Sequence, residues 1–258
     1  MNTDFETLEV HVENAIATIT ITNEPVNSID AEMRRELGEA VDILRDDRVR
    51  VGVITGNDGI FSVSADVALF EDAREWTTAD FRTNSRILGR AFDGLEALKK
   101  PVIAAIDGTC VGGGLELACD VRIVSPGSTL GFPEHKIGLI PGLGGCSRFV
   151  HIVGSGKAKD PIFTGKLVEG TEAHEIGLAE RLDDDPVAAA REYAESLCEQ
   201  PPQALGLAKQ VVNATRDADT KTAGLLESLA QSALLATEDH REGVDAFREK
   251  REPEFTGE

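Results

Sequence analysis

A glycine-rich segment, residues 108–116, has the composition of an anion-binding turn. Gly112, Gly113 and Gly114 come directly before a short stretch that contains Glu116. Glycines at the start of a helix let the backbone approach a ligand closely, and the first NH groups of a helix have no intrahelical partner. Such NH groups stabilise a negative oxygen, either of a phosphate or of a developing oxyanion. The segment also fits a turn packed tightly against a sheet, and it lacks the spacings typical of nucleotide phosphate loops.

Two glutamates near glycine-rich turns are candidates for proton transfer. Glu134 follows Phe132 and Pro133, and residues 138–145 beyond it are again rich in glycine. A carboxyl group that is partly desolvated in this setting has a raised pKa, which suits it to acid–base work. Glu134 fits a surface or capping position equally well, and Glu116 fits an exposed position on a short helix.

A third segment, residues 61–67, is made mostly of small side chains. It follows an apolar run that ends at Gly56. Small side chains leave backbone NH groups accessible, and Asp66 could cap a following helix. A loop in solvent is the alternative interpretation.

The pattern around these segments predicts an α/β fold. Residues 8–21 alternate as a β-hairpin, and Asp30 is a plausible N-cap for an amphipathic helix that reaches Leu44. The apolar runs 49–56, 101–106 and 121–124 predict strands, and residues 78–100 predict a helix between the first two. After Pro141 the chain has helical patterns broken by glycines. Beyond Pro201 and Pro202 the rest is predicted to be helical.

Composition indicates a globular enzyme with an acidic surface. The 258 residues contain 46 Asp and Glu against 26 Lys and Arg, which gives a net charge of −20, and the basic residues are 17 Arg and 9 Lys. This balance is typical of proteins from halophiles. Their acidic surfaces stay hydrated in concentrated salt, where the Debye length falls to about 3 Å. An acidic protein from a mesophile is the alternative. Both interpretations disfavour nucleic-acid binding, because no stripe of Lys and Arg with interleaved aromatic residues occurs.

Cysteine usage and hydropathy predict a cytoplasmic protein that does not bind membranes. The cysteines form no C-x-x-C pair, so neither a zinc site nor a disulfide framework is expected, and small buried residues are the simpler interpretation. Residues 1–10 lack the basic and apolar regions of a secretion signal, and no run approaches the roughly 18 apolar residues of a membrane span.

Taken together and in order, these segments resemble the enoyl-CoA hydratase/isomerase (crotonase) superfamily from about Val10 to Phe255. The resemblance rests on nine fragments: N-E-P-V-N-S at 23–28, F-S-V-S-A-D at 61–66, K-P-V-I-A-A-I-D-G at 100–108, G-G-G-L-E-L-A-C-D at 112–120, L-G-F-P-E at 130–134, G-L-I-P-G-L-G-G at 138–145, F-T-G at 163–165, A-H-E-I-G-L-A at 173–179 and E-D-H-R-E-G-V-D-A-F-R-E-K-R at 238–251. The joint order of the fragments makes this resemblance specific.

The resemblance implies a fold and an assembly. The expected fold is an α/β spiral of repeated ββα units, with a core over residues 1–200 that carries the acyl-CoA site. Residues 201–258 are expected to form a C-terminal helical region for trimerisation. The resemblance also implies a homo-oligomer, as a trimer or a dimer of trimers.

The resemblance implies an enoyl-CoA hydratase. Family members that hydrate enoyl-CoA carry two glutamates. The matching residues are Glu116, which would activate the attacking water, and Glu134, which would exchange the proton at the α-carbon. The NH groups of Ala65 and Gly113 would form an oxyanion hole for the thioester oxygen. Further positions are expected to line the CoA, thioester and acyl channel: Val26, Val63, Asp66, Val67, Gly112, Phe132 and Leu139. No metal or redox cofactor is expected, because coenzyme A arrives as part of the substrate.

Two departures from the family pattern fall near these positions. Ser64 stands where the family usually has Gly, and the stretch after Glu116 is two residues shorter than the family form.

Alternatives on the same scaffold are an enoyl-CoA isomerase, which often keeps a single carboxylate, a dehydratase for a branched or hydroxylated acyl chain, or a carbon–carbon hydrolase. A non-catalytic scaffold or RNA-binding relative is the alternative from another class.

The phosphates of CoA also call for a local basic cluster, with Lys99, Lys100, Arg248, Lys250 and Arg251 as candidates.

Overall fold

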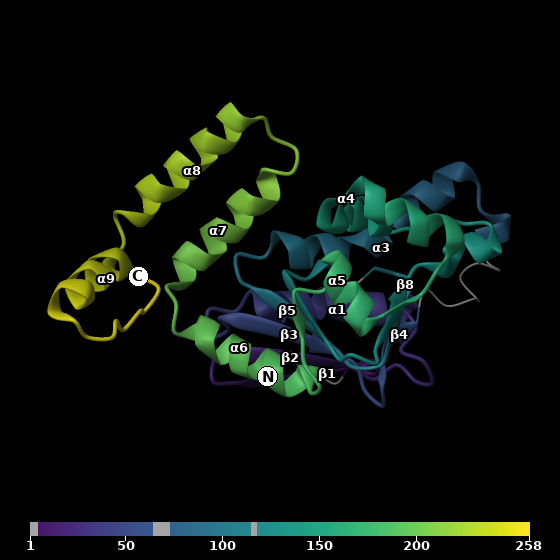
Figure 1. Ribbon diagram of the computed structural model, residues 1–258, viewed down its shortest axis with the longest axis horizontal. Coiled ribbons are helices and arrows are strands. Elements are labelled where there is room, and N and C mark those ends of the chain that lie inside the picture. The colour runs from purple at the N-terminus through teal and green to yellow at the C-terminus, as the bar shows by residue number, and fades with distance from the viewer. Residues whose placement is uncertain (1–4, 64–72, 115–117) are drawn as a thin grey trace.

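The computed structural model describes residues 5–63, 73–114 and 118–258, and it has two sheets flanked by helices (Figure 1). The larger sheet has the strand order β1-β2-β3-β5-β7-β10. Its strands are β1 (Leu8–Glu13), β2 (Ile16–Ile21), β3 (Val51–Thr55), β5 (Val102–Ile106), β7 (Val121–Val124) and β10 (Arg181–Leu182). The β1–β2 pair is the predicted antiparallel hairpin, and the other pairs are parallel.

A second, smaller sheet has the order β4-β6-β8-β9. Its strands are β4 (Ile60–Val63), β6 (Thr109–Val111), β8 (Thr129–Gly131) and β9 (Val168–Glu169). The first three are parallel, and β9 runs antiparallel to β8. The chain thus passes from the larger sheet to the smaller one three times, by β3–β4, β5–β6 and β7–β8. These repeats confirm the predicted spiral of strand pairs with intervening helices.

The helices begin where short-range chemistry predicts. The Asp30 carboxylate accepts a hydrogen bond of 2.8 Å from the Met33 NH at the start of α1, and Thr77 and Asp80 form a capping box at the start of α3. The helices are α1 (Ala31–Leu44), α3 (Thr78–Ala97), α4 (Gly145–Thr164), α5 (Gly170–Ile176), α6 (Pro186–Cys198), α7 (Pro202–Ala214), α8 (Thr220–Leu234) and α9 (Glu238–Glu249), with short 3-10 helices η1 (Ala73–Glu75) and η3 (Pro133–Ile137).

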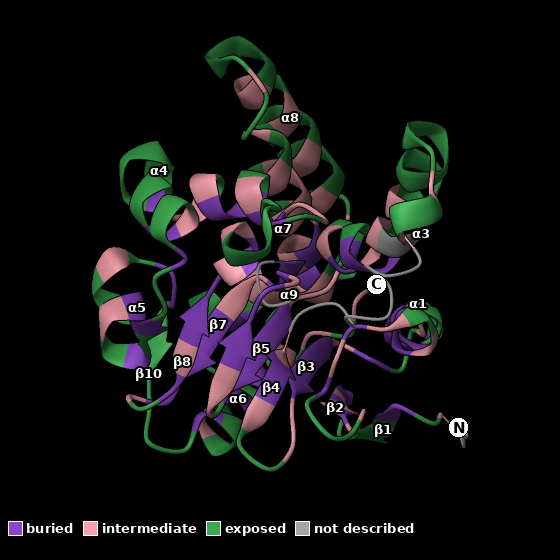
Figure 2. Cartoon of the chain, turned by 90° about the vertical axis from the view of Figure 1, so that its right-hand side faces the viewer, coloured by how far each residue is buried: buried purple, intermediate pink, exposed green. Residues whose placement is uncertain are grey.

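The core lies on both faces of the larger sheet (Figure 2). Every residue of β3 and β5 is buried, as expected for parallel strands covered on both sides. One face packs against α1 and α3 through side chains such as Leu37 and Phe92, and the other packs against Ala190 and Ala194 of α6.

The C-terminal helices extend away from these layers (Figure 1). No residue of α8 is buried, and large apolar side chains on α8 and α9 are exposed, including Leu225, Leu229 and Phe247. The last residues fold back on α9, where the buried Asp239 carboxylate accepts hydrogen bonds from the NH groups of Thr256 and Gly257. Within the described part of the chain, no helix is both long and apolar enough to cross a membrane.

The net charge of −20 predicts that salt stabilises this fold. Screening weakens the repulsion among the excess acidic groups, while isolated exposed ion pairs, which salt also weakens, contribute little. We expect the Tm to rise by several degrees as KCl increases from 0.05 to about 1 M, measured by calorimetry. NaCl at equal ionic strength serves as the control and is expected to act alike. A Tm that stays constant or falls over this range would contradict the prediction.

Candidate active site

The register of the smaller sheet brings the predicted segments to one edge. Val63 at the end of β4 lies opposite Val111 of β6, which in turn lies opposite Gly131 of β8. Because these strands are parallel, their carboxyl ends share one edge of the sheet. The glycine turn begins directly after Val111, and Glu134 lies three residues after Gly131. Segments far apart in the sequence therefore meet here.

The glycine turn has a backbone that other residues rarely adopt. Gly112, Gly113 and Gly114 have φ angles of 69°, 70° and 69°, in the left-handed region. The Gly112 NH donates to the Gly131 carbonyl at 2.8 Å, which fixes the turn to β8. The Gly113 NH points instead to the Glu134 carboxylate, with 3.4 Å between N and Oε1. The structure therefore brings two predicted site residues, Gly113 and Glu134, together.

Glu134 lies on η3 in a desolvated setting, as its sequence context predicts. Its side chain is 8% exposed, and Oε2 is buried without a hydrogen-bond partner among the described residues. Burial raises the pKa of the Glu134 carboxyl group, while hydrogen bonds from the NH groups of Glu134 itself and Gly113 oppose this shift. A carboxyl group whose pKa is raised in this way is suited to taking up and releasing a proton.

The contact between Gly113 and Glu134 is long for a hydrogen bond. A ligand oxygen that entered this place would compete well for the Gly113 NH. The arrangement can therefore bind a partly negative oxygen and exchange a proton within a few ångströms of it.

Val26 and Val63 lie side by side next to this edge. The Val63 NH donates to the Val26 carbonyl at 3.1 Å. The Ser62 hydroxyl donates to the Asn27 carbonyl at 2.8 Å, and the Asn27 amide donates to the Ile60 carbonyl at 2.7 Å. Val26 remains 37% exposed and is available to a ligand.

Phe132 and Leu139 differ in what they offer to a ligand. Leu139 is 41% exposed, and its NH donates to the Glu134 carbonyl at 3.0 Å. Phe132 is only 1% exposed, and its ring packs 5.2 Å from that of Phe149. Phe132 anchors the turn that carries Glu134 to the core. Its contact with an acyl chain stays a prediction.

Several predicted site residues lie outside the described residues: Ala65, Asp66, Val67 and Glu116. Their assignments therefore rest on the sequence, as does that of Ser64. Among the candidate cations, Lys100 donates to the Asp46 carbonyl at 2.6 Å, and Arg251 pairs with Glu242 and Glu249. These two side chains are thus already engaged within the chain.

One residue near the site was missed by the sequence analysis. Cys146, in the first turn of α4, was predicted to be only a small buried residue. Its thiol is half-buried, and its pKa is raised by burial and by the negative charge of Glu134. Its position directly after the glycine-rich stretch 138–145 was the available signal.

The burial of Glu134 predicts a pH-dependent gain in stability when its charge is removed. Burial raises the Glu134 pKa above 4.5, its ordinary value, which applies in the unfolded chain. As the pH rises above 4.5, this group therefore ionises more readily in the unfolded chain than in the fold, and the fold loses stability. We expect Glu134→Gln to have a higher Tm than the wild type at neutral pH, with a gain that shrinks as the pH approaches 4.5. Calorimetry over this pH range tests the prediction, with Glu175→Gln on the surface of α5 as a control that lacks the effect. A lower Tm for Glu134→Gln at neutral pH would contradict it.

Comparisons with known proteins agree with this geometry. A model of the family described as enoyl-CoA hydratase/isomerase matches residues 11–258. The short-chain-enoyl-CoA hydratase of Clostridium acetobutylicum is 34% identical over 250 residues, which cover 94% of each chain. The enoyl-CoA hydratase domain-containing protein 2 of human mitochondria is 36% identical over 232 residues, covering 86% of this chain and 78% of that protein.

Solved structures show the same fold. The crystal structure of enoyl-CoA hydratase from Bacillus anthracis superposes with a TM-score of 0.91 at 31% identity, covering 98% of this chain and all of that one. The crystal structure of an enoyl-CoA hydratase from Geobacillus kaustophilus gives a TM-score of 0.93 at 29% identity, covering 99% of this chain and 98% of that one. On these grounds the chain belongs to the enoyl-CoA hydratase/isomerase family, with a crotonase fold.

Proposed function

We propose that this protein adds water across the 2,3 double bond of a 2-enoyl-CoA thioester to give a 3-hydroxyacyl-CoA. The observation that carries the proposal is the buried Glu134 carboxyl group, with its raised pKa, beside the Gly113 NH. The name of the Clostridium relative, a short-chain-enoyl-CoA hydratase, supports the same reaction. Both glutamates of the hydratase pattern are present in the sequence, at Glu116 and Glu134.

In the proposed mechanism, the NH groups of Gly113 and Ala65 bind the thioester oxygen. Attack of water on the β-carbon makes this oxygen enolate-like, and fixed donors stabilise its charge without reorganising. Loss of one such donor typically costs about 3–4 kcal/mol of transition-state stabilisation. Glu116 takes a proton from the attacking water, and Glu134 delivers one to the α-carbon. The thioester activates the double bond, so the proposed reaction needs no other cofactor.

Hydration of crotonyl-CoA in concentrated KCl tests this proposal. Loss of the conjugated-thioester absorbance would report turnover of the wild type, Glu116→Gln and Glu134→Gln. We expect each substitution to lower kcat by about 10²–10⁴-fold, because each removes a group that transfers a proton. Glu175→Gln, which changes an exposed carboxylate on α5, is the matched control and should keep full activity.

Each result of this experiment has a distinct meaning. Loss of activity in both variants would establish the two-carboxylate hydratase. Loss in Glu134→Gln alone would indicate a site with a single essential carboxylate, as in an isomerase, and would implicate the shortened stretch after Glu116. An inactive wild type would refute hydration of crotonyl-CoA and direct the search to other acyl-CoA substrates.

We also propose that the chain assembles as a trimer or a dimer of trimers through its C-terminal helices. Leu225 and Leu229, one helical turn apart on α8, are 60% and 59% exposed, and Phe247 on α9 is 85% exposed. An apolar surface of this kind is typical of an oligomer interface. We expect light scattering to give three or six times the 27.6 kDa chain mass. Leu229→Glu should lower this mass, whereas Glu227→Gln on the same helix should not; a monomeric wild type would refute the assembly.

A further inference from the structure

The segment that carries the oxyanion donor Gly113 is held at both ends by described contacts. At its start, the Gly112 NH donates to the Gly131 carbonyl at 2.8 Å. At its end, Asp120 makes a reciprocal pair with Val102 of β5. The Asp120 NH donates to the Val102 carbonyl at 2.8 Å, and the Val102 NH donates to Asp120 Oδ2 at 2.7 Å. In the sequence, Asp120 comes seven residues after Gly113.

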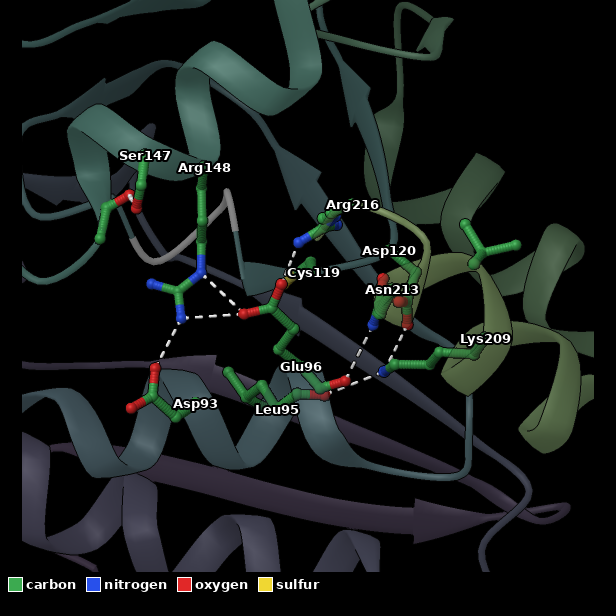
Figure 3. Close-up of polar contacts among 12 residues, drawn as sticks. Asp93, Leu95, Glu96, Cys119, Asp120, Ser147, Arg148, Lys209, Asn213 and Arg216 are labelled. Atoms are coloured by element: carbon green, nitrogen blue, oxygen red, sulfur yellow. Dashed lines mark hydrogen bonds and ion pairs between the residues drawn. The ribbon is translucent and has the colours of Figure 1, made fainter. Parts of the chain in front are cut away.

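The Asp120 carboxylate depends on a cation from another part of the chain. Lys209, in the middle of α7, places its ammonium 2.7 Å from Asp120 Oδ2 (Figure 3). The same ammonium donates to the carbonyl oxygens of Leu95 at 2.9 Å and Lys100 at 3.0 Å. Its three protons therefore have three acceptors, and its side chain is only 6% exposed. Burial raises the pKa of Asp120, and the charge of Lys209 opposes that shift.

Two more residues dock on the same end of α3: Asn213 of α7, and Arg216, which follows the end of that helix. Lys209 and Asn213 are four residues apart and so lie on one face of α7. The Asn213 amide donates to the Glu96 carbonyl at 3.1 Å, and Arg216 pairs with the Glu96 carboxylate, which also accepts a hydrogen bond from Arg148 of α4 at 3.1 Å (Figure 3). Of these three side chains, Lys209 is the one whose described contacts include Asp120.

We propose that Lys209 is a positioning residue for the oxyanion hole: through Asp120 it fixes the segment that presents the Gly113 NH to the substrate. This inference rests on the proposed function of Gly113. It makes α7, the first helix of the C-terminal region, part of the support of the active site. Lys209 itself touches no substrate, so its loss should affect how strongly a thioester is polarised, more than how tightly CoA is bound.

The test uses a thioester whose colour reports polarisation of its carbonyl oxygen, 4-(dimethylamino)cinnamoyl-CoA. We expect the wild type to shift the absorbance of the bound probe to the red. Lys209→Met should lose most of this shift and about tenfold in kcat for crotonyl-CoA, since small misplacements of catalytic groups have large effects on rate. The Kd for CoA should stay within about twofold of the wild type. Lys209→Arg, which keeps the charge, should recover part of the shift.

Asn213→Ala is the matched control, because it removes a contact between α7 and α3 without touching Asp120. It should keep the full red shift. If Lys209→Met does not fold because the half-buried Asp120 carboxylate has lost its cation, the double variant Lys209→Met/Asp120→Asn, which removes both charges, is used in its place. The double variant should again lose the red shift of the bound probe.

An unchanged red shift in folded Lys209→Met, or in the double variant, would overturn the proposal. An equal loss of shift in Asn213→Ala would also overturn it, since any loosening of α7 would then suffice. A red shift in a wild type that does not hydrate crotonyl-CoA would refute the hydratase alone, because the response to Lys209→Met would still decide the role of Lys209. A wild type without any shift would overturn the positioning role, because no polarising oxyanion hole would exist.

Discussion

The register of the smaller parallel sheet is the constraint on which the site depends. Val63, Val111 and Gly131 lie in one row across three strands, so the segments that leave those strands start from neighbouring points. Each crossing from the larger sheet supplies one strand to this row. A slip of one residue would turn every side chain of a strand to the opposite face and separate Gly113 from Glu134. The hydrogen bond between Gly112 and Gly131 ties the glycine turn to this register.

The site combines features that a stable fold would avoid. Three consecutive glycines have left-handed φ angles, and a carboxyl group is buried with one oxygen unpaired. Both cost stability, the first through the entropy of the unfolded chain and the second through desolvation. The surrounding core offsets these costs, since Phe132 and Phe149 hold the turn that carries Glu134. Ionisable groups at functional sites often have a pKa shifted by burial, and the rest of the fold offsets the stability that this burial costs.

Sequence patterns predicted the longer elements and the chemistry of single residues well. The hairpin at 8–21, the helix capped by Asp30 and the buried strands at 51–55 and 102–106 all carry strong local signals, and the structure confirms them. The desolvation of Glu134 followed from its neighbours. Residue patterns did not predict the strands of the smaller sheet, because strands of two to four residues show no periodicity and their partners are distant in the chain. Only the family resemblance implied them, as part of the repeated ββα units. Burial of Phe132 could not be predicted either, since it depends on packing against Phe149 in a helix that comes later.

The contacts of α7 have a consequence for how the chain unfolds. The sequence suggests a boundary near residue 200, between a core and a helical tail. Yet Lys209 and Asn213 donate to the carbonyl groups of Leu95 and Glu96 at the end of α3, and Lys209 pairs with a half-buried carboxylate beside β5. A chain cut at this boundary would expose these groups in the part that keeps the candidate site residues. Polar contacts therefore tie α7 to the end of α3 while the same helix also packs against α8, so the predicted boundary near residue 200 separates groups that depend on each other.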